Sequence, residues 1–174
     1  MFNGLTDWTV GAFYKQTEEN LLRQYTYLDS DYASEFAPTT TALYLETETR
    51  LRDDLTLVAG IRAENYDFDF ADNRGLTRDN DTNMLGGKVA LQYTLGKHFY
   101  YASISRGYKG PGFNVFYNFN PAIHTRPIGP EESDAIELGY KYATQDLSLN
   151  VALFNTDISG FQANNFDCSD GTCI

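Results

Sequence analysis

Two cysteines near the end of the chain are the residues best suited to covalent chemistry. Cys168 and Cys173 enclose residues 169–172, and this spacing matches neither a Cys-x-x-Cys redox motif nor half of a common zinc knuckle. An Asp-Gly pair between them favours a turn. Because such thiols oxidise readily in an oxidising compartment, we expect a disulfide that closes a small loop tip. The alternative is a pair of free thiols.

A second candidate for chemistry is a segment rich in aromatic and amide side chains. Its members are Phe113, Asn114, Phe116, Tyr117 and Phe119. Aromatic rings stack on flat ligands such as a catecholate or a sugar, and the amide supplies hydrogen bonds. The same rings could instead pack against one another within a loop, or belong to an interfacial girdle. The sequence leaves these alternatives open.

A calcium-binding loop is the one metal site that the spacing of acidic residues suggests. Asp79, Asp81 and Asn83 begin like such a loop. However, Met84 and Ala90 stand where an EF-hand needs a glycine and a bidentate glutamate, which excludes an EF-hand. A looser calcium site on acidic loop tips is left as a hypothesis.

Catalysis finds no support in the remaining polar residues. His98 and His124 have no partner at metal-ligand spacing, so solvated surface histidines are the better interpretation. Adjacent acids point to opposite faces of a strand and cannot act as a pair. We therefore predict no catalytic residue, no metal centre and no resident cofactor, and we predict that the protein is not an enzyme.

The elements that must position these residues are strands. Apolar and polar residues alternate with the period of two that is typical of a strand, and no segment predicts a helix. The seven predicted strands cover residues 5–15, 38–50, 55–64, 84–94, 99–111, 136–142 and 147–157. One face of each is apolar, while the other carries polar side chains such as Arg62, Lys88 and Glu137.

The predicted connections alternate in length. The short ones cover residues 51–54, 95–98 and 143–146, and the long ones cover 16–37, 65–83, 112–135 and the tail from about 155. Compact soluble domains favour connections of about 4–6 residues. Transmembrane barrels instead combine short periplasmic turns with long outer loops. The pattern therefore favours an all-β, antiparallel transmembrane β-barrel over a soluble β-sandwich.

The charge is unevenly distributed. The chain has 13 Lys+Arg against 24 Asp+Glu, for a net charge of −11. The acidic excess lies in the predicted long connections, and it argues against nucleic acid as a partner. Aromatic residues end several apolar faces, as in the girdles at membrane interfaces. They are Trp8, Tyr14, Tyr93, Tyr100, Tyr108, Tyr140 and Tyr142.

The predicted strand count does not close a barrel. Bacterial single-chain barrels have an even number of strands, eight or more, and an open sheet would expose two unpaired edges to lipid. The first residues also lack the basic and apolar regions of a signal peptide. We therefore expect residues 1–174 to be a partial β-barrel domain, with the signal peptide and other parts of the protein absent.

Three stretches carry a family resemblance. Residues 99–114 read FYYASISRGYKGPGFN, which resembles the strand of TonB-dependent outer-membrane receptors that usually reads YAxxSxGYKxGGFN. Residues 129–141, GPEESDAIELGYK, look like the family's next conserved stretch, and residues 147–157 resemble the strand that follows it. The resemblance covers roughly residues 1–166. Its main departure is Gly-Pro-Gly at 110–112, where the family usually has Gly-Gly.

The resemblance implies a roughly 22-stranded barrel with a plugged lumen. The plug, its energy-coupling box and the last strand would lie outside this chain. It also implies active uptake across the outer membrane of a Gram-negative bacterium, with energy from the TonB complex acting through the plug. The implied partners are outer-membrane lipid and a scarce ligand: a ferric siderophore or other iron complex first, then haem, cobalamin or an oligosaccharide. A passive porin-like channel and a soluble β-sandwich binding module are the alternatives.

Overall fold

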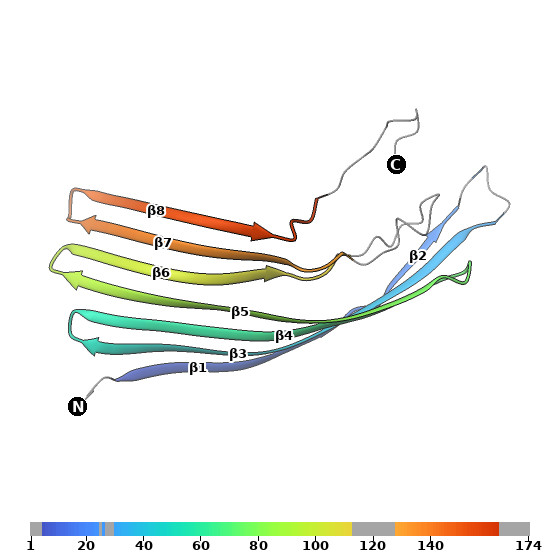
Figure 1. Cartoon of the computed structure of the whole chain (residues 1–174), viewed down its shortest axis with the longest axis horizontal. Coiled ribbons are helices and arrows are strands. Elements are labelled where there is room, and N and C mark those ends of the chain that lie inside the picture. Colours follow the sequence, from blue (N-terminus) through green and yellow to red (C-terminus); the bar gives the residue numbers. More distant parts are fainter. Residues whose placement is uncertain (1–4, 25, 27–29, 113–127, 164–174) are drawn as a thin grey trace.

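The chain forms one antiparallel sheet. The computed structural model describes residues 5–24, 26, 30–112 and 128–163. Its strands are β1 (Thr6–Gln16), β2 (Glu19–Arg23), β3 (Tyr32–Arg52), β4 (Leu55–Asp72), β5 (Thr77–Leu95), β6 (His98–Lys109), β7 (Glu131–Ala143) and β8 (Ser148–Ser159). Seven follow one another as β1-β3-β4-β5-β6-β7-β8, and β2 pairs with β3 alone (Figure 1). No helix in the described ranges is long and apolar enough to cross a bilayer.

The register between strands aligns the apolar residues on one face. Leu45 lies opposite both Val10 and Ile61, and Leu138 lies opposite both Ala102 and Leu153. We call this surface the apolar face. Its large members are Trp8, Val10, Leu43, Leu45, Leu57, Ile61, Leu85, Val89, Leu91, Ile104, Ile136, Leu138, Leu149, Val151 and Leu153.

The apolar face is open over the whole sheet. Leu43 is 67% exposed and Leu153 is 71% exposed. A soluble protein rarely leaves so large a contiguous apolar surface uncovered. The described strands form a single sheet, so no second layer packs on this face as a β-sandwich requires. The predicted β-sandwich alternative is therefore wrong, and the predicted antiparallel barrel wall is confirmed.

An aromatic cluster borders the apolar face beside the short turns, as predicted. The ring centroids of Tyr100 and Tyr140 are 5.1 Å apart, and those of Tyr93 and Tyr100 are 6.3 Å apart. His98 joins the cluster, because its Nδ1 lies 2.8 Å from the hydroxyl of Tyr140 and its ring lies 5.0 Å from that of Tyr142. His98 thus packs among rings and is not a solvated surface residue.

The connection predicted over residues 65–83 is wrong, because most of it is strand. β4 continues to Asp72 and β5 begins at Thr77, leaving a tight turn. The Asp72 carboxylate accepts hydrogen bonds from the backbone N–H groups of Arg74 (2.9 Å) and Leu76 (2.8 Å), and Gly75 has a φ of 85°. Asx-type hydrogen bonding and a glycine with positive φ are typical of such turns.

The longer strands build a second sheet region beyond the apolar face. We call it the extension: β2, residues 32–41 of β3, residues 65–72 of β4 and residues 77–83 of β5 (Figure 1). β2 lies within the connection predicted over 16–37, where no strand was expected. Its register pairs Leu21 with Ser34 and Arg23 with Tyr32.

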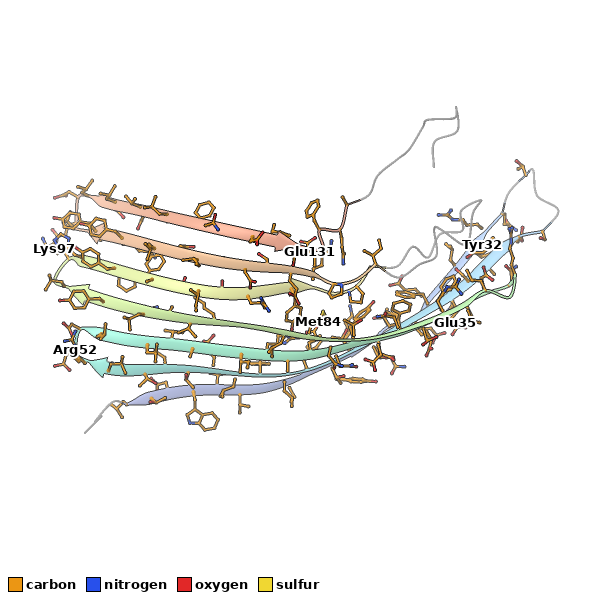
Figure 2. The ribbon with its side chains drawn as sticks, in the orientation of Figure 1. Tyr32, Glu35, Arg52, Met84, Lys97 and Glu131 are labelled. Carbon is orange, nitrogen blue, oxygen red and sulfur yellow. The ribbon has the colours of Figure 1, made fainter. Side chains whose placement is uncertain are left out.

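Aromatic side chains form a dry core on one face of the extension. Phe68 is 0% exposed, and the Phe36 and Phe68 rings lie 5.2 Å apart. Tyr32, which Figure 2 labels, is 1% exposed. Burial raises the pKa of the Tyr32 and Tyr66 hydroxyls above the ordinary value, because the core disfavours the phenolate. This core stabilises the extension independently of the apolar face.

We expect Phe68→Ala to unfold the extension locally while the rest of the sheet remains intact. Loss of a buried phenylalanine costs about 3–5 kcal/mol, and the extension has few other fully buried side chains. Limited proteolysis of the full-length protein in detergent would detect new cleavage within residues 65–83. Asp69→Ala is the matched control, since Asp69 is the next residue and points to the exposed face. Equal protease resistance of both variants would contradict this account.

Candidate functional site

The polar face of the sheet contains a pocket of about 680 Å³. Residues from β3, β4, β5 and β6 line it. The polar members are Tyr44, Glu46, Arg62, Glu64, Lys88, Arg106 and Tyr108. Gly60, Gly86 and Gly107 also line the pocket. Because glycine has no side chain, these positions leave space among the long side chains of the other lining residues.

Arg62 organises the centre of this pocket. Its Nε donates to Glu64 Oε2 at 2.9 Å and to the Tyr108 hydroxyl at 3.2 Å, and its Nη2 forms an ion pair with the same carboxylate. The guanidinium also lies 5.4 Å from the centroid of the Phe13 ring, within cation–π distance. Arg62 and Glu64 therefore neutralise each other and hold two aromatic rings in place.

The position of Tyr108 corrects the predicted outer girdle. Alternation along residues 99–111 assigned this ring to the apolar face, but its hydroxyl contacts Arg62 and Glu64 on the polar face. The pairing of β5 with β6 ends at Gly87–Arg106. Beyond it the Tyr108 ring covers Gly86, where a Cβ would lie 2.8 Å from ring atom Cε1. The glycine opens the space, and the end of pairing lets the ring turn into it.

Tyrosine rings cover glycines at two further places on the polar face. Tyr44 lies over Gly11, and Tyr101 lies over Gly139, its direct partner on the next strand. A ring packed on a cross-strand glycine compensates for the side chain that the glycine lacks. The Tyr101 hydroxyl also donates to Glu137.

Two charged residues of the pocket keep their polar atoms available. Glu46 and Lys88 each lie opposite Gly60, one on either side of it. Neither forms an ion pair with another residue in the described part of the chain. Two strand spacings separate their backbones by about 10 Å. A polar or charged ligand group placed over Gly60 could therefore contact the Glu46 carboxylate on one side and the Lys88 ammonium on the other.

Gln162 joins the ends of two strands at the opposite end of the sheet from the short turns. Its side-chain Nε2 donates to the carbonyls of Gly110 and Gly129, both at 2.9 Å. Its backbone N–H donates to the Glu131 carboxylate at 2.9 Å. This single residue, three positions after the end of β8, thereby fixes the chain at the end of β6 and at the start of β7. Nothing in the sequence pattern indicated this role.

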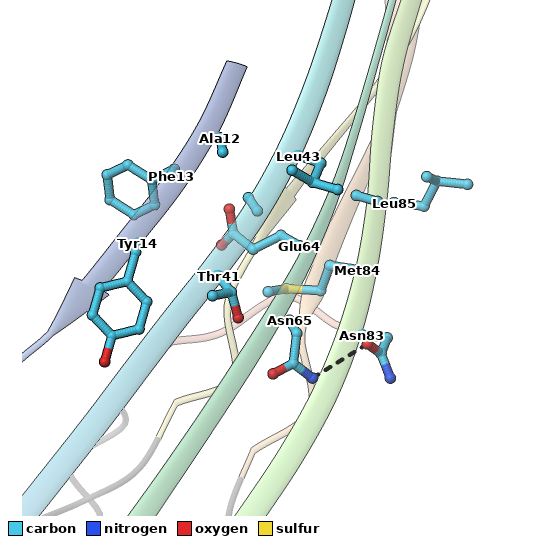
Figure 3. A pocket seen from close by; sticks show the side chains of 12 residues that line it. Ala12, Phe13, Tyr14, Thr41, Leu43, Glu64, Asn65, Asn83, Met84 and Leu85 are labelled. Atoms are coloured by element: carbon cyan, nitrogen blue, oxygen red, sulfur yellow. Dashed lines mark hydrogen bonds between the residues drawn. The ribbon is translucent and has the colours of Figure 1, made fainter. Parts of the chain in front are cut away.

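The groove in Figure 3 lies mainly on the apolar face and has a volume of about 770 Å³. Small residues of neighbouring strands, Ala12, Thr41 and Ala63, line its bottom. At one end Asn65 donates to Asn83 at 3.2 Å. The groove marks where the apolar face gives way to the polar extension, and its apolar-face side chains offer no reactive group.

The site residues predicted from the sequence have different outcomes. The aromatic segment (Phe113, Asn114, Phe116, Tyr117 and Phe119) and the cysteines Cys168 and Cys173 lie outside the described residues, as does His124. Asp79, Asp81 and Asn83 lie on strand β5 and not on a loop tip. The described residues contain no group of three or more His, Cys, Asp or Glu side chains that could hold a metal ion.

The polar pocket offers charged groups to a partner, and its central carboxylate, Glu64, is paired with Arg62. A comparison with known families agrees with the arrangement of strands. The model of the TonB dependent receptor-like β-barrel family matches residues 2–174. The chain belongs to this family.

The curated relatives that the chain matches are longer proteins. It is 27% identical over 169 residues to the pesticin receptor of Yersinia enterocolitica, covering 90% of this chain and 24% of the relative. The chain thus spans about a quarter of the length of the curated relatives that it matches.

Solved structures share the fold. The ferric yersiniabactin uptake receptor from Yersinia pestis matches with a TM-score of 0.72 at 21% identity, covering 90% of this chain and 26% of that one. The ferric-catecholate import receptor from E. coli K12 matches with a TM-score of 0.67 at 19% identity, covering 97% and 30%. The family match also favours a receptor over the porin-like alternative.

We expect Gly139→Ala to destabilise this TonB-dependent receptor wall. The new Cβ would collide with the Tyr101 ring and displace its hydroxyl from Glu137. Overpacking of this kind costs about 1–3 kcal/mol. The thermal unfolding midpoint of the full-length receptor in detergent would fall. Gly107→Ala is the matched control, because a Cβ there meets nothing within 4 Å. The account fails if the two variants unfold together.

Gln162→Glu should loosen the end of the sheet that Gln162 joins. The substitution replaces an amide donor with a carboxylate that faces the carbonyls of Gly110 and Gly129, while the backbone N–H still donates to Glu131. Loss of these hydrogen bonds costs about 1–3 kcal/mol. Hydrogen exchange at residues 110–112 and 128–131 should accelerate, while exchange at β3 and β4 stays unchanged. Gln145→Glu, in an exposed turn, makes the same change without these contacts. Equal exchange in both variants would contradict the assignment.

Proposed function

We propose that the chain forms part of the barrel wall of an outer-membrane receptor that imports a ferric siderophore with energy from the TonB complex. The observation that carries the proposal is the continuous apolar face, in register across seven strands, within a chain that matches the TonB-dependent receptor family over residues 2–174. Such a wall needs lipid against its apolar face, since nothing else of this extent would cover it.

The choice of ligand is supported by the relatives. Two of the solved structures with the same fold are a ferric yersiniabactin uptake receptor and a ferric-catecholate import receptor. Iron complexes of siderophores are therefore the first class of ligand to test. A curated relative is a pesticin receptor, so the whole protein is also proposed to bind a ligand from outside the cell.

The polar face lines the lumen in this proposal. Glu46 and Lys88 then point toward the plug or toward a ligand that passes it, with Arg62 and Glu64 as a neutral pair further along β4. Burying isolated charges is costly, so a lumen-facing anion and cation favour a partner surface that is itself charged or wet. In this proposal the TonB complex acts on the plug and not directly on this part of the barrel wall. The plug is proposed to be another part of the whole protein.

The test is uptake of iron-55 complexes by the full-length receptor in a Gram-negative strain that lacks its own siderophore receptors. We expect accumulation of at least one ferric siderophore when TonB is present, and a loss of nearly all of it in a matched strain without TonB. Empty vector is the control for leakage.

Two outcomes would overturn the proposal. Uptake that continues without TonB would identify a passive channel. Failure of every ferric siderophore in the panel, together with TonB-dependent uptake of haem, cobalamin or an oligosaccharide, would assign a different ligand class.

A further inference from the structure

The N-terminal half of β5 has one edge that pairs with no other strand in the described part of the chain. Residues 77–85 pair with β4 on one side, and pairing with β6 begins only at Gly87. Figure 1 shows β5 continuing into the extension after β6 has diverged from it. Nine residues at about 3.4 Å each give an edge of about 30 Å. Its backbone N–H and C=O groups are a template for a further strand.

This edge lacks three of the features that protect strand edges, and charged side chains are the protective feature that it keeps. Residues 77–85 contain no proline and no lysine, and the β4–β5 register runs without a bulge from Thr77 to Tyr93. Natural edges are commonly protected by those three features. What the edge does carry is negative charge on its exposed face.

Acidic side chains form two rows on that face of the extension. Asp79 lies opposite Asp69, and Asp81 lies opposite Asp67. All four are exposed. Like charges directly opposite each other destabilise a strand pair, so the extension retains this arrangement at a cost. A strand added beside β5 would place its own residues directly opposite Asp79 and Asp81, and cationic residues there would relieve the repulsion.

We propose that the edge of β5 over residues 77–85 binds an extended, cationic polypeptide by strand addition. The alternation of β5 sets the sequence of the partner. On the exposed face Asp79 and Asp81 select lysine or arginine at every second position. On the opposite face the edge presents Arg78, Asn80 and Thr82, which favour small polar residues at the positions between. Acidic strands are repelled by the same aspartates, and neutral strands form no ion pair with them.

The probe is a nine-residue peptide of alternating lysine and threonine, titrated into the full-length receptor in nanodiscs. Binding is followed by fluorescence anisotropy of the labelled peptide. We expect saturable binding. Asp79→Asn combined with Asp81→Asn should weaken it about five- to tenfold, because two cross-strand ion pairs are lost.

Asp67→Asn combined with Asp69→Asn is the matched control. It removes the same charge from the same face, but one strand further from the edge. Strand addition predicts an effect of less than about twofold there, since the charges are then about 10 Å from the added strand. Equal losses for the two double variants would mean attraction without strand pairing and would overturn the proposal.

A second control separates backbone pairing from charge. Two versions of the peptide carry N-methyl groups at every lysine or at every threonine, which removes N–H donors from one edge of the strand or the other while the charge stays constant. Strand addition predicts that one version binds much more weakly than the other. The proposal is overturned if both bind like the parent peptide, or if the parent peptide does not bind the receptor at all.

Discussion

The register of the backbone ladder is the constraint on which the rest of the structure depends. In a strand the side chains alternate between faces, so a slip of one residue between any two strands would move an entire row to the wrong side. Here the seven paired strands keep Leu45, Leu91 and Leu138 on the same face. That agreement creates a surface suited to lipid and, behind it, a surface that can carry charge.

The polar face uses the same ladder to place aromatic rings on glycines. Tyr44, Tyr101 and Tyr108 each occupy the space that a glycine on a neighbouring strand leaves empty. Two of their hydroxyls form polar contacts on this face: Tyr101 donates to Glu137, and Tyr108 accepts from Arg62. Packing and polar contacts are thereby combined in single side chains, which leaves Glu46 and Lys88 open to a partner.

In the extension, burial of aromatic side chains offsets repulsion between carboxylates. Its strands have an aromatic core on one face and carboxylates on the other, so Phe68 supplies the stabilising burial that Asp67 and Asp69 oppose. The aromatic side chains of one face are buried and the other face is acidic, so the extension does not expose a large apolar surface as the apolar face does. This explains why the strands can continue beyond the apolar face, and why the chain has a strongly acidic region beside a nearly neutral sheet.

Alternation and charge in the sequence were sufficient for the fold class and for the faces of most residues. They correctly assigned Arg62, Lys88 and Glu137 to the polar face, because alternation is a local property of each strand. The family resemblance of residues 99–114 also indicated the family that the match over residues 2–174 establishes.

Only the tertiary structure decided the features that depend on neighbouring strands. Asp and Asn disfavour strands in isolation, so residues 65–83 and 16–37 were predicted as connections, whereas pairing with β3 and burial of Phe68 make much of them strand. Tyr108 was assigned to the wrong face because the space above Gly86 belongs to another strand. The contacts of Gln162 join segments more than 30 residues away. The sequence by itself determined which face each strand presents, and pairing decided where the strands end and what fills the gaps between them, because those energies arise between segments that are distant along the chain.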